Sequence, residues 1–125
     1  MARILIVEDE PLIARMLEEW LTELSHTPVG PTGSVKKALA VVDQGGFDAA
    51  ILDVNLAGQR CEPVATALAA LGLPFAFATG DSISSLDPRF ADRPSLSKPY
   101  DFKAVSQVVA LLLTAAAAAP ATSLR

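Results

Sequence analysis

Cysteine, histidine and long apolar runs are scarce in this chain of 125 residues, which has one cysteine and one histidine. The lone cysteine, Cys61, excludes a disulfide within the chain. No apolar run approaches the roughly 18 residues that a membrane-spanning helix needs. Met1-Ala2-Arg3 leads directly into a predicted strand, which leaves no room for a signal peptide. We therefore expect a cytoplasmic protein that does not enter a membrane.

Positive charge is in the minority as well. Ten Lys and Arg stand against 14 Asp and Glu, which gives a formal net charge of −4. Nucleic-acid binding depends on clustered positive charge, so this balance argues against direct contact with DNA or RNA. Hydrophobic residues, in contrast, make up 51% of the sequence. That fraction is enough for the core of one compact domain.

Short apolar runs alternate with segments of helical periodicity along the chain. Predicted helices begin at Pro11, near Ser34, at Pro63 and near Asp101, and the last should end before Pro120. Predicted strands cover residues 3–7, 28–30, 47–53, 75–79 and 95–97. The alternation predicts an α/β fold, a doubly wound parallel sheet of five strands in the order 2-1-3-4-5 with helices on both faces.

Polar residues stand where these strands end. Glu8 and Asp9 follow the first strand, Asp53 ends the third, Thr79 ends the fourth and Lys98 follows the fifth. In open parallel sheets, ligands bind at the carboxyl ends of the strands, where the strand order reverses. The first and third strands flank that point. We therefore expect these five side chains to form one anionic, cation-binding pocket.

Three carboxylates in one crevice repel one another, by roughly 4 kcal/mol for two charges about 4 Å apart at an effective dielectric near 20. A bound cation relieves this repulsion. Glu8, Asp9 and Asp53 offer only oxygen, and the single histidine, His26, lies at the far end of the first predicted helix. This donor set favours Mg²⁺, or Mn²⁺, over Zn²⁺. The backbone carbonyl of Asn55, in the loop after Asp53, can reach the same ion.

A hydroxyl and an ammonium are the groups that phosphoryl oxygens require beside a metal ion, and Thr79 and Lys98 supply them. A carboxylate can itself be the nucleophile and become an aspartyl phosphate. Asp53 is the candidate, because Glu8 and Asp9 at the adjacent strand end are better placed to hold the ion.

The motifs that carry these residues resemble the receiver domain of two-component response regulators over nearly the whole chain; they lie at residues 4–11, 52–56, 78–80 and 97–100. The resemblance implies that Asp53 accepts a phosphoryl group from a histidine kinase or a histidine phosphotransfer protein. It also implies that Glu8, Asp9 and the Asn55 carbonyl bind Mg²⁺, and that Thr79 and Lys98 contact the phosphoryl oxygens. The Lys98–Pro99 bond would be cis. A signalling domain of this kind is not expected to turn over a separate substrate as an enzyme does.

The chain departs from the family in its switch residues. Receivers usually carry Tyr or Phe three residues before the lysine, where this chain has Ser95. Residues 77–80, Phe-Ala-Thr-Gly, partly resemble a subgroup of single-domain receivers best represented in alphaproteobacteria. Without an aromatic at Ser95, we expect phosphorylation to order residues 80–90, with Phe90 or Leu86 docking on the sheet. For Trp20, Tyr100 and Phe102 the expected role is helix packing.

We expect the receiver domain to span residues 1–119, with residues 120–125 as a short tail and no output domain. Phosphorylation would then act through a changed interaction surface, or the phosphoryl group would pass to another protein. The chain is expected to be a monomer or weak dimer, with an unassigned downstream partner.

Two other functions use the same residues. A small Mg²⁺-dependent phosphohydrolase could employ Asp53 as its nucleophile, but such enzymes normally have a second, acid–base Asp two residues later, where this chain has Asn55. A protein-interaction module that is never phosphorylated is the other alternative. The complete set of pocket residues argues against it.

Overall fold

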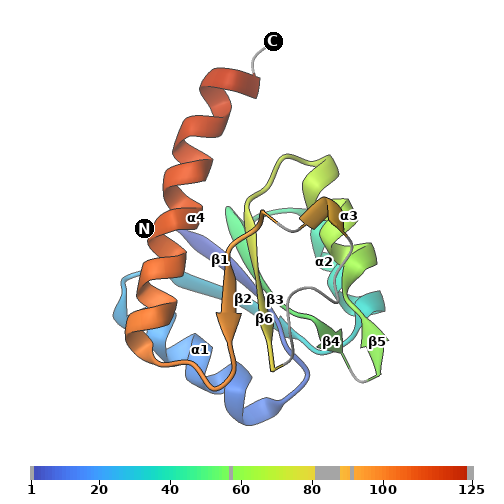
Figure 1. Ribbon diagram of the computed structural model, residues 1–125, viewed down its shortest axis with the longest axis vertical. Helices are drawn as coiled ribbons and strands as arrows, with labels where there is room; N and C mark the ends of the chain where they lie inside the picture. The colour runs from blue at the N-terminus through green and yellow to red at the C-terminus, as the bar shows by residue number, and fades with distance from the viewer. Residues whose placement is uncertain (1, 57, 81–87, 91, 124–125) are drawn as a thin grey trace.

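The structure is a computed structural model that describes residues 2–56, 58–80, 88–90 and 92–123, with side chains of the last helix described as far as Thr114. Five parallel strands form one sheet in the order β2-β1-β3-β6-β7 (Figure 1). This is the predicted order 2-1-3-4-5, because β4 and β5 form a separate hairpin. The strands of the sheet are β1 (Arg3–Val7), β2 (Thr27–Thr32), β3 (Ala49–Asp53), β6 (Phe75–Thr79) and β7 (Ser95–Ser97).

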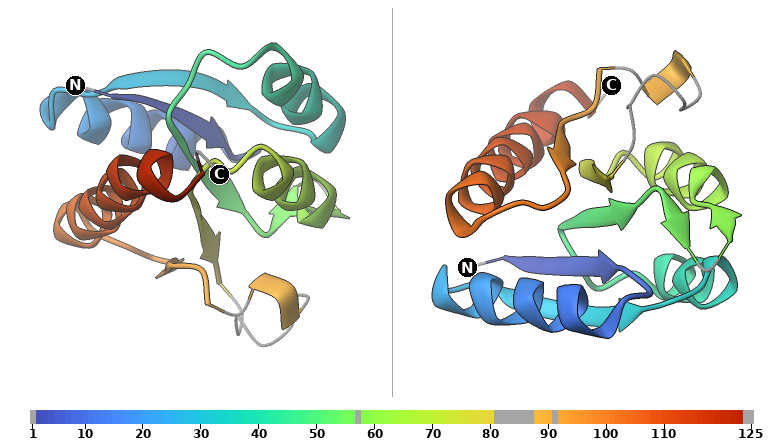
Figure 2. Two further views of the ribbon diagram at one scale, coloured as in Figure 1. Left: turned by 90° about the horizontal axis from the view of Figure 1, so that it is seen from above. Right: turned by 60° about the horizontal axis from the view of Figure 1, so that its bottom comes forward.

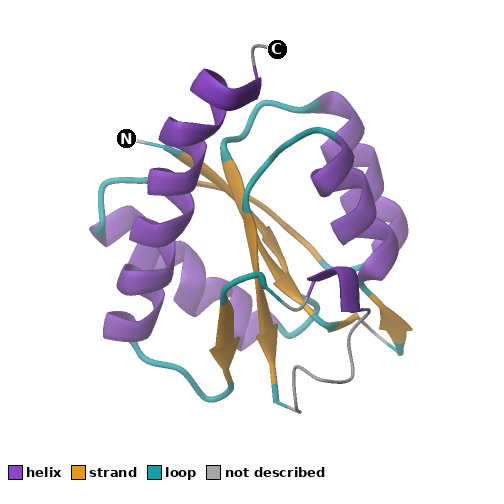
Figure 3. Ribbon diagram, turned by 45° about the horizontal axis from the view of Figure 1, so that its top comes forward, coloured by secondary structure: helices purple, strands orange, loops and turns teal. Residues whose placement is uncertain are grey.

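Within the described residues, four α-helices cover the two faces of the sheet, which confirms the doubly wound arrangement (Figures 2 and 3). One face is covered by α1 and α4, and the other by α2 and α3. The helices are α1 (Pro11–Glu23), α2 (Val35–Gln44), α3 (Glu62–Ala70) and α4 (Phe102–Ser123). Both β3 and β6 are buried along their whole length, as expected for strands with helices on each side.

The two faces differ in the side chains that fill them. Aliphatic residues fill the layer under α1 and α4, among them Ile4, Ile6 and Leu17. Phenylalanines gather in the layer under α2 and α3, where Phe75 and Phe77 are two residues apart in β6 and therefore point to the same face. Their rings meet edge to face with centroids 5.5 Å apart. The core therefore has one aromatic and one aliphatic half.

Local sequence signals set most of the helix ends. Pro11 lies in the first turn of α1, where its missing N–H leaves no bond unmade. The Ser34 hydroxyl accepts a hydrogen bond from the Lys37 N–H at 3.2 Å and caps α2. Gly45, with φ +74°, ends that helix. The third strand begins at Ala49 rather than at Phe47 as predicted.

A short antiparallel hairpin follows β3 where the sequence predicted only a loop. It consists of β4 (Asn55–Leu56) and β5 (Gln59–Arg60). Gly58 makes its turn with φ +88°, as its freedom from a side chain allows. Two residues per strand are too few for an alternating pattern to reveal, so the sequence carried no signal for the pairing. The hairpin lies directly after the end of β3.

Between β6 and β7 the described residues contain one turn of 3₁₀ helix, Pro88–Phe90. Phe90 is 2% exposed, and its ring centroid lies 5.9 Å from those of both Phe75 and Phe77. The structure thus places Phe90, one of the two residues expected to dock on the sheet, against two rings of β6. That phosphorylation orders residues 80–90 stays a prediction. Leu86, the other expected anchor, lies outside the described residues.

The last helix runs further than predicted. It continues through Pro120 to Ser123, beyond the expected end before that proline. Five alanines, the best helix formers, carry it up to the proline, and the turn that includes Pro120 has no such signal in the sequence. Its final turns project past the sheet (Figure 1). Of the helices in the described part of the chain, none has the length and apolar character needed to cross a membrane.

Candidate functional site

The carboxyl ends of β1 and β3 bring three carboxylates together. Glu8 and Asp9 follow β1, and Asp53 is the last residue of β3. One oxygen from each of these side chains lies within 4.8 Å of one from each of the others. The parallel register explains the meeting, because β1 and β3 run side by side with Val7 opposite Leu52. Asp9 is exposed, whereas Glu8 and Asp53 are buried.

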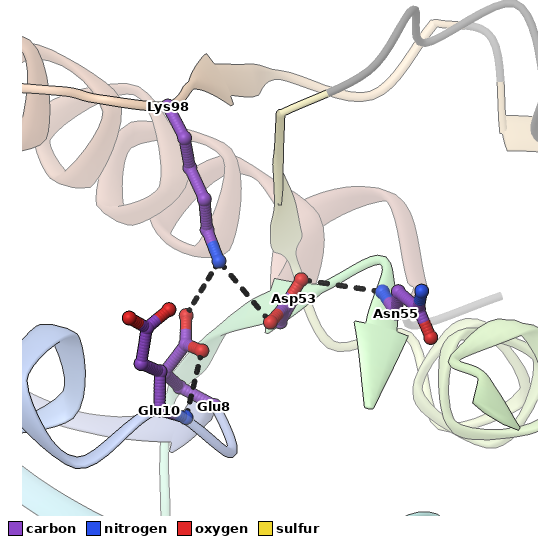
Figure 4. Close-up of polar contacts among 5 residues, drawn as sticks. All are labelled: Glu8, Glu10, Asp53, Asn55 and Lys98. Atoms are coloured by element: carbon purple, nitrogen blue, oxygen red, sulfur yellow. Dashed lines mark hydrogen bonds and ion pairs between the residues drawn. The ribbon is translucent and has the colours of Figure 1, made fainter. Parts of the chain in front are cut away.

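Lys98 reaches into this cluster from the segment after β7 (Figure 4). Its ammonium lies 3.1 Å from Glu8 Oε1 and 3.2 Å from Asp53 Oδ2. The Lys98–Pro99 peptide is cis, as predicted. One positive charge thus stands between two of the three carboxylates, which leaves the cluster with an excess of negative charge.

Backbone donors fix the two buried carboxylates. The Asn55 N–H donates to Asp53 Oδ1 at 3.2 Å, and the Glu10 N–H donates to Glu8 Oε2 at 3.1 Å (Figure 4). Each bond joins residues two apart in the sequence, so the chain turns back on its own carboxylate at the end of each strand. The carboxylates are therefore held in place before any ligand arrives.

Thr79 completes the edge at the end of β6 and is 7% exposed. Its carbonyl accepts a hydrogen bond from the Lys98 N–H at 2.8 Å. This backbone bond ties the lysine to the strand that carries the threonine. The structure therefore places all the predicted site residues at one edge of the sheet, with Asn55 at the start of the hairpin.

The charges of the site favour the binding of a further cation. Burial, and then the neighbouring Asp53 carboxylate, raise the pKa of Glu8 to about 7. Burial lowers the pKa of Lys98, but its contacts with Glu8 and Asp53 outweigh this and raise it. A group of this net charge is stabilised by a further cation. Three oxygen donors within reach of one another fit a hard divalent ion such as Mg²⁺, which needs only one or two carboxylates beside its waters.

The sequence motifs, the parallel sheet and this pocket together define a protein family. Residues 4–81 match the response regulator receiver domain. The chain belongs to this family and is a phosphoacceptor signalling domain. Receiver domains bind Mg²⁺ in their acidic pocket and are phosphorylated by histidine kinases or phosphotransfer proteins.

Individual relatives show how far the likeness extends. The solution structure of SdrG from Sphingomonas melonis Fr1 is 57% identical, with a TM-score of 0.81, over 90% of this chain and 97% of that one. The crystal structure of the response regulator TrrA from Thermotoga maritima, in complex with Mg²⁺ and beryllofluoride, is 28% identical with a TM-score of 0.79, over 90% of this chain and 99% of that one.

A third relative is longer. The transcriptional regulatory protein TcrA of Mycobacterium tuberculosis is 48% identical over 56 residues, which is 45% of this chain and 22% of TcrA. The match thus spans about a fifth of the length of that curated relative.

Sequence reasoning missed two features of the site. It treated Glu8 and Asp9 alike, yet Glu8 is 3% exposed and bound to Lys98 while Asp9 faces solvent. The sequence held a signal for this, because Glu8 directly follows the apolar run of β1. In the structure Glu8 continues the strand pairing, since its N–H donates to the Thr32 carbonyl of β2 at 2.9 Å. The second feature is the buried hydroxyl of Tyr100, which nothing in the sequence distinguished from a packing aromatic.

Proposed function

We propose that Asp53 is the residue of this receiver that accepts the phosphoryl group, and that Glu8, Asp9 and the Asn55 backbone carbonyl hold Mg²⁺. The observation that carries the proposal is the cluster of three carboxylates, two of which contact the Lys98 ammonium. Asp53 is the member on the hairpin side, with one oxygen on a backbone N–H and the other on Lys98. Both contacts orient the carboxylate for attack.

The chemical step is the transfer of one phosphoryl group from a phosphohistidine. An Asp53 oxygen attacks the phosphorus atom, the O–P bond forms, and the N–P bond of the donor breaks with its electron pair returning to the imidazole. When bound, Mg²⁺ supplies positive charge to the phosphoryl oxygens. The Lys98 ammonium and the Thr79 hydroxyl take the remaining oxygens. Lys98 is already within 3.2 Å of Asp53, so a small shift carries it to the new group.

The two alternative functions are not favoured by these findings. A phosphohydrolase needs an acid–base carboxylate near its nucleophile, and the residue two positions after Asp53 is Asn55, whose backbone N–H holds Asp53. An interaction module without phosphorylation has no use for a carboxylate such as Glu8, whose pKa is raised by burial and then by the neighbouring Asp53. The likeness to receivers supports the phosphoacceptor instead.

The proposal has several further parts. The protein acts in the cytoplasm, as a monomer or weak dimer, and Mn²⁺ can replace Mg²⁺ because both accept oxygen ligands. Phosphorylation changes an interaction surface, or the phosphoryl group passes on, with no separate substrate turned over. Its net charge of −4 argues against contact with nucleic acid.

Acetyl phosphate with Mg²⁺ tests the assignment without a partner kinase. Intact-mass spectrometry should show one added phosphoryl group on the wild-type protein and none on Asp53→Asn. Asp43→Asn is the matched control, because Asp43 is an exposed carboxylate on α2, and it should be labelled like wild type. A phosphoryl group on the Asp53→Asn protein would show that another residue is the acceptor.

A further inference from the structure

The hydroxyl of Tyr100 is buried and, among the described residues, has no hydrogen-bond partner. Tyr100 follows Lys98 by two residues, and its ring packs partly buried beside the aliphatic half of the core. A buried donor without a partner is costly, and native proteins keep such groups rarely and for a reason. A cost of this kind is explained if another state of the protein supplies the missing acceptor.

Tyr100 forms a wall of two grooves. One, of about 400 Å³, lies between the start of α1 and the segment after β7; Glu10, Ile13 and Met16 line it together with residues 98–100. The other, of about 560 Å³, lies between β7 and α4 and includes Ser95 and Gln107. A movement of the segment that carries Lys98 and Tyr100 would therefore change the shape of both grooves.

Glu10 is the acceptor that the first groove offers. It is exposed, it precedes α1, and its carboxylate lies beside that of Glu8 on the side facing Lys98 (Figure 4). Burial, together with the charges of Glu8, Asp53 and Glu10, raises the pKa of Tyr100. The phenol therefore keeps its proton and stays a donor, within the electrostatic reach of the Glu10 carboxylate.

We propose that Tyr100 is a positioning residue for the phosphoryl site: when Asp53 carries its phosphoryl group, the Tyr100 hydroxyl donates a hydrogen bond to the Glu10 carboxylate across the first groove. This inference rests on the proposed function. In the structure, the Lys98 ammonium is shared by Glu8 and Asp53. A phosphoryl group draws that ammonium toward its own oxygens, the segment that carries Lys98 and Tyr100 moves with it, and the Tyr100 hydroxyl comes within reach of Glu10 across the groove that both residues line.

The bond has a defined consequence. It ties the start of α1 to the segment after β7, and it holds Lys98, between them, against the phosphoryl oxygens. A contact made in only one state shifts the equilibrium toward that state by its differential free energy. Loss of the hydroxyl should therefore destabilise the phosphorylated state. It should not destabilise the state without a phosphoryl group, because there it removes a buried donor that lacks a partner among the described residues.

Beryllofluoride with saturating Mg²⁺, titrated by calorimetry, tests the inference on four proteins: wild type, Tyr100→Phe, Glu10→Gln and the double variant. Tyr100→Phe keeps the ring and removes only the hydroxyl. Its affinity for beryllofluoride should fall about tenfold, the usual scale for a hydrogen bond to a charged group. The affinity of Glu10→Gln for beryllofluoride should fall less, and the double variant should bind no more weakly than Tyr100→Phe. Without ligand, urea unfolding should show Tyr100→Phe at least as stable as wild type.

The remaining outcomes each overturn the inference. Unchanged affinity in Tyr100→Phe would show that the hydroxyl makes no contact in the occupied state. Fully additive losses would show that Tyr100 and Glu10 do not act on each other. A Tyr100→Phe protein that is less stable without ligand would assign the hydroxyl a structural role. Failure of the wild-type protein to bind beryllofluoride would overturn the proposed function and this inference with it.

Discussion

The core of the sheet and the pocket at its carboxyl edge are buried to a similar degree but are held together in opposite ways. Phe77 in the core is fully buried, and Glu8 and Asp53 in the pocket are 3% and 7% exposed. In the core, every contact lowers the free energy of the folded state. In the pocket, buried carboxylates face one another and raise it: burial, and then the neighbouring Asp53 carboxylate, hold the pKa of Glu8 above its usual value.

This difference teaches which substitutions should harm stability and which should harm function. Atoms removed from the core leave a cavity, whereas a charge removed from the pocket relieves repulsion. Lys98 offsets the repulsion only in part, because one ammonium stands against a cluster of three carboxylates. The pocket is therefore a place where the fold gives up stability for the ability to bind a cation and a phosphoryl group.

The largest effect on stability should come from the core. Phe77→Ala removes a ring packed against Phe75 and Phe90 and should lower the free energy of unfolding by about 3–5 kcal/mol. Urea unfolding monitored by circular dichroism measures this. Leu71→Ala is the control, because Leu71 is 59% exposed, and it should change stability by less than about 0.5 kcal/mol. Equal losses at the two positions would contradict the account.

The second-largest effect on stability should be its dependence on pH, and this dependence should come from the pocket. The pKa of Glu8 is raised from 4.5 to about 7, so between these values the folded protein binds a proton that the unfolded chain releases. Stability without metal should therefore fall as pH rises from about 5 to 7, by about 2 kcal/mol from this group. Subtracting the stability–pH profile of Glu8→Gln from that of wild type cancels the contributions of the other carboxylates and leaves that of Glu8. A difference profile that is flat, or rises with pH, would refute the prediction.

Substitution of Asp9, the exposed carboxylate of the cluster, should have a smaller effect, on the affinity for Mg²⁺. Asp9→Asn removes one charge without opening the core, so Mg²⁺ affinity should fall by about tenfold, or 1.4 kcal/mol. Metal-free stability should stay the same or rise, because repulsion is reduced. Calorimetric titration with Mg²⁺ gives the affinity, with Asp43→Asn as the control. Wild-type affinity in Asp9→Asn would place the ion elsewhere.

The smallest effect should come from a cation at the edge of the core. The Arg93 guanidinium lies 4.3 Å from the centroid of the Phe75 ring, so Arg93→Ala should lower stability by about 0.5–1 kcal/mol. Arg15→Ala is the matched control, since Arg15 forms an exposed ion pair with Glu19 and its loss should cost still less. Indistinguishable unfolding curves for Arg93→Ala and wild type would show that the ring contact adds nothing.

The sequence predicted the sheet and its carboxyl edge well because both depend on simple patterns. Apolar runs such as 3–7 and 75–79 ended where the strands end, and helices between them required a parallel sheet. The polar residues just after those runs had to meet, because parallel strands end at the same edge. The order of the strands and the place of the pocket therefore followed from local signals.

The rest depended on contacts between distant residues, which patterns do not carry. Phe90 was expected to dock on the sheet, but nothing near it in the sequence shows that its ring packs against both Phe75 and Phe77. The hairpin at Asn55 is too short for periodicity to reveal. The packing of β1, α1 and the segment after β7 decides the different burial of Glu8 and Asp9 and buries the hydroxyl of Tyr100.

The comparison between core and pocket is tested most directly by the unfolding free energies of wild type and Asp53→Asn, measured with and without Mg²⁺ and beryllofluoride. Without ligands, the variant should be at least as stable as wild type, because one repelling charge is gone. With Mg²⁺ present in both samples, adding beryllofluoride at 100 times its dissociation constant should stabilise wild type by about 2.7 kcal/mol, while Asp53→Asn should gain little from it. A variant that is less stable without ligands, and equally stabilised by them, would contradict the account.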